Sequence, residues 1–105
     1  MRPDKNILRR LTFAIVDCVQ PERIVLFGSA ASGKMHPQSD IDLMVVMPEG
    51  THRRRTAQKL YREIRGFKIP FDLVVATPSD LTRYGRSPGL IYRDILRNGK
   101  DIYAA

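Results

Sequence analysis

Residues 27–46 read FGSAASGKMHPQSDIDLMVV, and this stretch decides the fold. Ten residues separate a small-residue turn, Gly28-Ser29, from two acidic residues, Asp40 and Asp42, which begin an apolar run. Glycine lets the backbone approach a phosphate closely, and carboxylates suit the divalent metals that neutralise phosphates. The stretch therefore supplies two halves of a site for phosphoryl transfer, a turn that can hold phosphates and a carboxylate pair that can hold a metal.

Strand and helix patterns alternate on either side of this stretch. Short apolar runs, typical of buried strands, occupy residues 23–27, 40–47 and 71–76, and residues 101–103 form a candidate edge strand. The run at 40–47 is apolar on both faces, which predicts a central strand. Because helical patterns are interspersed with these runs, the expected class is α/β or α+β.

Helices are expected wherever apolar residues recur with a period near 3.6 or a capping residue precedes them. Asp4 is a candidate N-cap for the first helix, and Pro21 would end it. The apolar side of this helix is expected to carry Ile7, Leu8, Leu11, Ile15, Cys18 and Val19. Thr51 is a candidate N-cap for a helix whose buried stripe is Ala57, Leu60, Tyr61 and Ile64. Two shorter helices are predicted to begin at Thr77-Pro78 and at Ser87-Pro88, the second ending at Gly99.

Length and composition predict one domain spanning residues 1–105, with 43% hydrophobic and 28% charged residues. No apolar run approaches the ~20 residues of a membrane span, and a single cysteine, expected to be a core thiol, fits a cytoplasmic protein. The net charge of +7 favours acidic partners such as nucleotides, nucleic acid or an acidic protein. Much of it lies on the helix expected after Thr51, where a solvated face is the favoured interpretation. Since no aromatic residues are interleaved with these cations, specific nucleic-acid binding is not expected.

Three carboxylates could converge on one site. Asp40 and Asp42 alternate along a strand, so they point to one face about 7 Å apart. Asp72 is the one charged residue of the run 71–76, and a lone carboxylate in a central strand is costly unless it is paired or bound to metal. If the third strand lies beside the second, the three together could hold two metals roughly 4 Å apart, the spacing used in phosphoryl transfer.

Each feature also has a plainer interpretation. A Gly-Ser pair is usually only a turn, an Asp-x-Asp at a strand start is often a cap, and Asp72 could pair with an arginine in a structural ion pair. Considered jointly, with the turn after one strand and the carboxylates on two others, they favour the functional interpretation.

The pattern Gly28-Ser29-x10-Asp40-x-Asp42, with Asp72 on a later strand, resembles the nucleotidyltransferase superfamily that includes DNA polymerase beta. The size and the phrase Ser39-Asp40-Ile41-Asp42-Leu43 are similar to its shortest branch, the minimal nucleotidyltransferase (MNT) family. The resemblance extends from the first strand to Lys100. It implies a small mixed sheet of three to four strands flanked by helices, and an enzyme that transfers a nucleoside monophosphate from a triphosphate with release of pyrophosphate.

The resemblance also implies roles for individual residues. Asp40 and Asp42 would ligate two Mg²⁺ or Mn²⁺ ions, and Asp72 would ligate the catalytic ion and help to deprotonate the acceptor hydroxyl. Gly28 and Ser29 would hold the β- and γ-phosphates of ATP. The family often carries arginines just after the Gly-Ser, whereas this chain has Ala30-Ala31-Ser32-Gly33-Lys34. Lys34 would supply a point charge in their place, without the bidentate grip of arginine.

Members of this size commonly accompany a HEPN-domain toxin, so the resemblance implies an antitoxin that transfers AMP from ATP to a tyrosine of that partner. A short chain without an acceptor-binding domain fits this role, because another chain must deliver the acceptor. Two alternatives stay open: a non-catalytic antitoxin that neutralises its toxin by binding, and a nucleotidyltransferase for small molecules or RNA. The sequence leaves open whether the chain forms homo- or hetero-oligomers.

Overall fold

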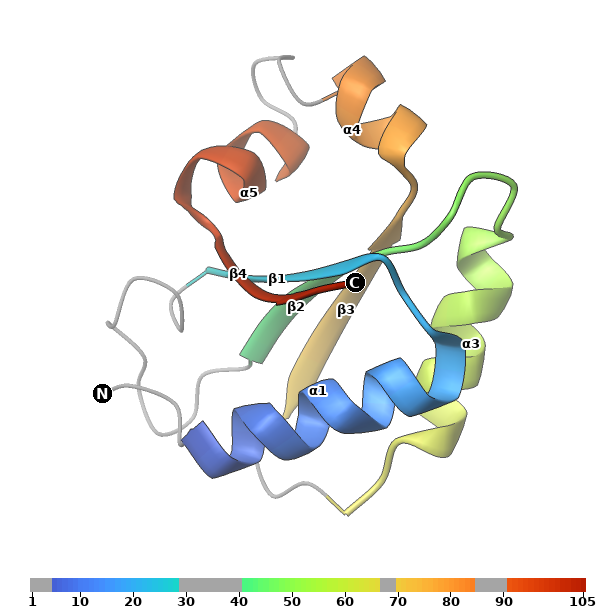
Figure 1. Cartoon of the computed structure of the whole chain (residues 1–105), viewed down its shortest axis with the longest axis vertical. Coiled ribbons are helices and arrows are strands. Elements are labelled where there is room, and N and C mark those ends of the chain that lie inside the picture. Colours follow the sequence, from blue (N-terminus) through green and yellow to red (C-terminus); the bar gives the residue numbers. More distant parts are fainter. Residues whose placement is uncertain (1–4, 29–40, 67–69, 85–90) are drawn as a thin grey trace.

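The computed structural model describes residues 5–28, 41–66, 70–84 and 91–105, which form four helices and a four-stranded sheet (Figure 1). The helices are α1 (Lys5–Val19), α3 (Arg53–Glu63), α4 (Pro78–Tyr84) and α5 (Ile91–Asn98). The strands are β1 (Arg23–Phe27), β2 (Ile41–Val46), β3 (Phe71–Ala76) and β4 (Lys100–Ala104). The mixed sheet flanked by helices confirms the predicted class. Within the described ranges, no helix is long and apolar enough to cross a membrane.

The sheet has the strand order β3-β2-β1-β4. β1 pairs antiparallel with β2 and β4, whereas β2 and β3 are parallel. Parallel neighbours need a crossover connection, and α3 supplies it between β2 and β3. β2 therefore lies inside the sheet, as its two apolar faces predicted. β3 lies at one edge and β4 at the other, so the expectation that residues 71–76 form a central strand is wrong.

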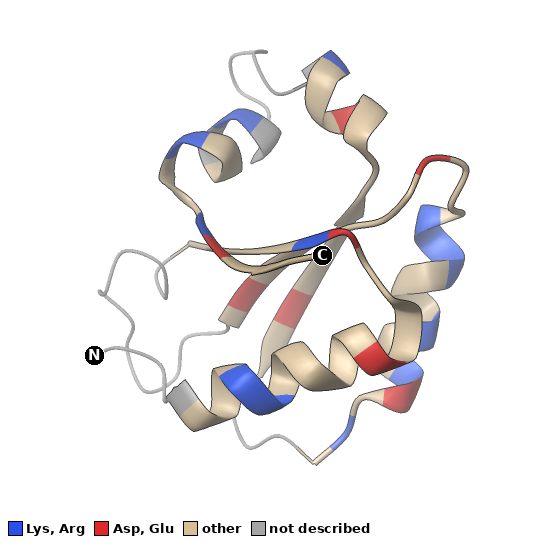
Figure 2. Cartoon of the chain, viewed as in Figure 1, with Lys and Arg blue, Asp and Glu red and all other residues tan. Residues whose placement is uncertain are grey.

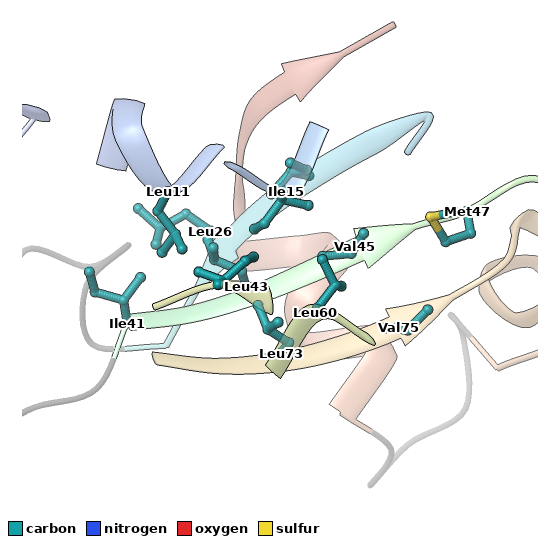
Figure 3. Packing of buried hydrophobic residues seen from close by; sticks show 12 residues of the cluster. Leu11, Ile15, Leu26, Ile41, Leu43, Val45, Met47, Leu60, Leu73 and Val75 are labelled. Atoms are coloured by element: carbon teal, nitrogen blue, oxygen red, sulfur yellow. The ribbon is translucent and has the colours of Figure 1, made fainter. Parts of the chain in front are cut away.

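One face of the sheet packs against α1 and α3 (Figures 1 and 3). Leu11 and Ile15 of α1 and Leu60 of α3 are almost completely buried there. They meet the residues of β1, β2 and β3 that point to this face, which are Ile24, Leu26, Ile41, Leu43, Val45, Leu73 and Val75. Burial of each large aliphatic side chain is worth about 1.5–3 kcal/mol, so this cluster is the main source of stability.

The opposite face carries a smaller apolar cluster under α4 and α5. Val25, Phe27, Met44, Val46 and Ala76 pack there against Ile95 of α5, with Leu81 of α4 alongside. Because side chains alternate along a strand, every second residue of β1, β2 and β3 faces this side. The helices thus form two layers with the sheet between them (Figure 1).

Local details of α3 differ from the sequence expectations. The N-cap is His52 rather than Thr51, because the His52 Nδ1 accepts the backbone N–H of Arg55 at 3.2 Å. The Thr51 hydroxyl instead donates to the Pro48 carbonyl at 2.7 Å. Tyr61, expected in the buried stripe, is 46% exposed. The predicted cap Asp4 and the expected helix start at Ser87-Pro88 lie outside the described residues.

Candidate functional site

Asp42 of β2 and Asp72 of β3 lie directly opposite each other. They are partners in the parallel register of the two strands, so their side chains leave the same face of the sheet. Figure 2 shows an acidic position on each of these two strands. This is the face that carries Met44 and Val46 and that α4 and α5 cover farther along. Register partners on neighbouring strands are about 5 Å apart, so both carboxylates can reach one ligand.

Gly28 lies next to the Asp42 side chain. It follows Phe27, which is the register partner of Asp42 across β1 and β2. Gly28 has a φ of 74°, in the left-handed region, and a Cβ at this position would overlap Asp42 Oδ2 and lie 3.3 Å from its Cγ. Both the backbone angle and the carboxylate therefore require glycine here. Gly28 therefore lies directly against the Asp42 side chain.

The two carboxylates differ in burial. Asp42 is half-buried on the inner strand, whereas Asp72 is exposed on the edge strand. The sequence argument that burial makes Asp72 costly is therefore wrong, although Asp72 does lie beside Asp42. The pair is unusual because the two carboxylates are close together. Like charges directly opposite on neighbouring strands destabilise a sheet, so a purely structural role does not explain them.

A divalent cation fits these donors. Carboxylate oxygens are the ligands that Mg²⁺ and Mn²⁺ prefer, and a divalent cation offsets the repulsion between neighbouring carboxylates. Within the described ranges no three His, Cys, Asp or Glu side chains are grouped closely enough to hold a metal. The third predicted ligand, Asp40, lies outside the described residues, as do Ser29 and Lys34. The described part of the site therefore consists of Asp42, Asp72 and Gly28.

Tyr61 supports the start of β3, a role that its sequence position did not reveal. Its hydroxyl accepts the backbone N–H of Leu73 at 2.7 Å, and its ring stacks on Phe71 with centroids 5.9 Å apart and planes 5° from parallel. Phe71 and Leu73 flank Asp72, so α3 holds the strand segment that carries this carboxylate. Residues 61 and 71 are brought together only by the crossover, and no local sequence signal marks the contact.

Cys18 does not belong to this site. It is half-buried at the end of α1 and packs against the main apolar cluster, as expected of a core thiol, and its thiol donates to Glu63 Oε2 at 3.1 Å. Burial raises the pKa of the Cys18 thiol, and the hydrogen bond to Glu63 and the charge of that carboxylate raise it further. The thiolate is the reactive form, so this environment disfavours nucleophilic chemistry.

A family comparison covers nearly all of these elements. The sequence profile of the nucleotidyltransferase domain matches residues 8–102, from within α1 to within β4. The chain belongs to the nucleotidyltransferase domain family. The family resemblance predicted from the Gly-Ser and Asp-x-Asp motif is thereby confirmed. A comparison of the sequence with curated proteins found no match.

Solved structures agree with the family. A protein from Sulfolobus solfataricus described as a nucleotidyltransferase has a TM-score of 0.65 at 18% identity, over 94% of this chain and 78% of its own. A toxin–antitoxin complex with AMP-PNP has a TM-score of 0.60 at 25% identity, over 98% and 75%. The toxin–antitoxin MntA-HpeT, in a variant with two aspartates changed to glutamate, has a TM-score of 0.58 at 21% identity, over 98% and 75%. The two toxin–antitoxin neighbours agree with a place in the minimal nucleotidyltransferase branch.

Proposed function

We propose that this nucleotidyltransferase transfers AMP from ATP to a hydroxyl group of a partner protein, using Mg²⁺ held by Asp40, Asp42 and Asp72. The observation that carries the proposal is the register of β2 and β3, which sets the Asp42 and Asp72 side chains on one face against the Gly28 turn. Bound Mg²⁺ would neutralise the phosphate oxygens and the charge that develops during transfer. Three carboxylates are enough to hold two ions, as the family resemblance implies. Mn²⁺ could take the place of Mg²⁺ at either position.

Each residue has a defined task in this proposal. The Asp72 carboxylate accepts the proton of the acceptor hydroxyl, whose oxygen then attacks the α-phosphorus of ATP. The new oxygen–phosphorus bond forms as the bond from the α-phosphorus to the bridging oxygen of the β-phosphate breaks, and pyrophosphate leaves. The Gly28 backbone, Ser29 and Lys34 bind the β- and γ-phosphates, where Lys34 offsets part of their charge. An exposed Asp72 on an edge strand suits an acceptor that arrives on another molecule.

The proposed acceptor is a tyrosine of a HEPN-domain toxin, which makes the chain the antitoxin of a pair. Support comes from the two toxin–antitoxin structures among the neighbours, one of which was solved with the ATP analogue AMP-PNP. A tyrosine hydroxyl provides the nucleophile that the chemistry requires. The single cysteine of the chain fits a cytoplasmic setting for such a pair.

Asp42→Asn tests the proposal directly. The substitution keeps the size of the side chain but removes the charge that faces Asp72, so we expect at least a hundredfold slower AMP transfer. The measurement is the intact mass of the toxin partner after incubation with Mg²⁺ and ATP. Asp17→Asn, which changes an exposed carboxylate on α1, is the matched control and should transfer AMP like the wild type. Wild-type rates of transfer by Asp42→Asn would refute the proposed chemistry.

A second candidate is an antitoxin that neutralises its toxin by binding alone. The sequence Ala30-Ala31-Ser32-Gly33-Lys34 favours it, because arginines that family members often carry after the Gly-Ser are missing. The Asp42→Asn variant separates the two functions: if it still neutralises the toxin in cells without transferring AMP, binding suffices.

A further inference from the structure

One side of α3 carries a dense group of cations that the proposed site does not use. Arg54, Arg55, Lys59, Arg62 and Arg65, the last just beyond the helix, are all exposed, and we call this group the basic face. Arg55 and Arg62 are two turns apart on the side of α3 opposite the buried Leu60. Figure 2 shows Lys and Arg along much of α3.

The cations at the start of α3 do not stabilise the helix itself. The first turn of α3 contains Arg53, Arg54 and Arg55 and no acidic residue, although the positive end of the helix dipole disfavours cations there. Arg53 is neutralised by Asp80 at 3.2 Å. Within the described residues, no ion pair joins the basic face to a carboxylate. Cations that oppose the helix dipole at Arg54 and Arg55, in a group without a carboxylate partner among the described residues, indicate an external anion.

A hollow beside the basic face has the size and lining for part of such an anion. It has a volume of about 480 Å³ and is lined in part by Gln20, Arg55, Thr56 and Lys59. The two cations and the Gln20 amide offer donors that a phosphate group needs, whereas the Thr56 hydroxyl already donates to the His52 carbonyl at 3.0 Å. Lys59 Nζ donates to the carbonyl of Cys18 at 3.2 Å, which holds the lysine at the rim of this hollow.

The chemistry of the basic face favours a nucleic acid over a protein. Stable protein interfaces need buried apolar anchors at their centre, and the five residues that define this face are all cationic. Nucleic-acid interfaces are polar and strongly positive, and their affinity comes largely from phosphate contacts. From Arg54 to Arg62 the helix rises about 12 Å, room for roughly three to four nucleotides at 3.4 Å each.

We propose that the basic face binds the sugar-phosphate backbone of a nucleic acid without sequence preference, with one phosphate in the hollow beside Arg55 and Lys59. This binding is separate from nucleotide transfer, because α3 packs on the face of the sheet opposite to the one that carries Asp42 and Asp72. A nucleic acid on α3 therefore leaves the Asp42–Asp72 pair accessible.

The test measures binding of a fluorescent oligouridine of twenty nucleotides to the full chain by anisotropy, at salt concentrations from 50 to 200 mM. The variant Arg54→Gln/Arg55→Gln/Arg62→Gln removes three cations and leaves the contacts of Arg53 and Lys59 intact. We expect at least tenfold weaker binding at 50 mM salt. The slope of log affinity against log salt should fall by about 2, since each phosphate contact on a single strand contributes roughly 0.7.

The matched control is Arg9→Gln/Arg97→Gln/Lys100→Gln, which removes the same charge from exposed positions on other elements. It should keep the wild-type slope, and Arg→Lys at 54, 55 and 62 should keep most of the affinity. Because Arg54 and Arg55 oppose the helix dipole whereas Arg62, in the last turn, favours it, the melting temperature of the Gln variant should stay close to that of the wild type. Equal losses in both triple variants, no binding by the wild type at 50 mM salt, or equally tight binding of polyglutamate would overturn the proposal.

Discussion

At the scale of one residue, Gly28 is required both by the backbone conformation and by the position of the Asp42 carboxylate. Its positive φ is strained for any other residue, and its Cβ position is already taken by the Asp42 carboxylate. These two constraints can be separated, because Gly50 also has a positive φ, of 87°, but nothing lies within 4 Å of its Cβ position. Gly50 thus reports the cost of the backbone angle alone.

We predict that Gly28→Ala destabilises the protein by about 1–2 kcal/mol for the backbone angle, plus a further cost for displacing Asp42. It should also weaken binding of Mn²⁺, since the carboxylate must move. Gly50→Ala should show only the first effect. Urea unfolding gives the stabilities and calorimetric titration with Mn²⁺ gives the affinities. Identical behaviour of the two variants would show that Gly28 does not constrain Asp42.

At the scale of an element, α4 is held by a capping arrangement at its first turn. Asp80 Oδ2 accepts from the backbone N–H of Thr77 at 2.9 Å and from its hydroxyl at 3.0 Å. Asp80 Oδ1 also pairs with Arg53 of α3 at 3.2 Å, and Glu49 accepts from the backbone N–H and hydroxyl of Ser79. The sequence Thr77-Pro78-Ser79-Asp80 predicted this cap, because it places a threonine, an N1 proline and an acidic residue in the order that a capping box requires.

We predict that Asp80→Ala lowers the free energy of unfolding by about 1–2 kcal/mol, because Thr77 is only 8% exposed and its N–H would lose its partner. Arg53→Gln removes the ion pair but keeps the cap. Its cost should stay below about 1 kcal/mol, since Arg53 is 51% exposed. Urea unfolding of both variants measures the difference. A larger loss for Arg53→Gln would mean that the ion pair, rather than the cap, holds α4.

Across the whole molecule, stability rests on the layer formed by α1, α3 and one face of the sheet. Ile15 is fully buried in this layer, whereas Phe13, two residues away on α1, is 66% exposed. We predict that Ile15→Ala costs about 2–4 kcal/mol of unfolding free energy and Phe13→Ala less than about 1 kcal/mol. Thermal unfolding followed by circular dichroism would compare them. Equal losses would place the stabilising contacts elsewhere.

Much of this architecture could be predicted from local patterns. The runs at 23–27 and 71–76 coincide with β1 and β3 because each is apolar and bounded by turn or polar residues. The cap of α3 was missed by one residue, since Thr51 and His52 are both competent acceptors and only the turn at Pro48 decides between them. The edge position of β3, and with it the exposure of Asp72, could not be predicted, because the pairing of a strand depends on distant segments rather than on its own residues.

The candidate site was predictable to a similar degree. Asp42 and Gly28 belong to one sequence motif. The prediction that Asp72 lies near Asp42 depended on the assumption that their strands are neighbours, although the two residues are thirty positions apart in the chain. The support from Tyr61 was invisible for the same reason, since its contacts with Phe71 and Leu73 exist only once α3 has crossed over the sheet.

The direct opposition of Asp42 and Asp72 has a consequence for how such chains can change over time. Each strand presents alternate residues to opposite faces, so an extra residue between Phe71 and the rest of β3 would turn Asp72 toward α1 and α3. Extra residues in the connections before and after α3 would leave the pairing untouched. Homologues are therefore free to gain or lose residues in those connections. Within β3, however, the acidic residue must stay at a position whose side chain points to the same face of the sheet as Asp42.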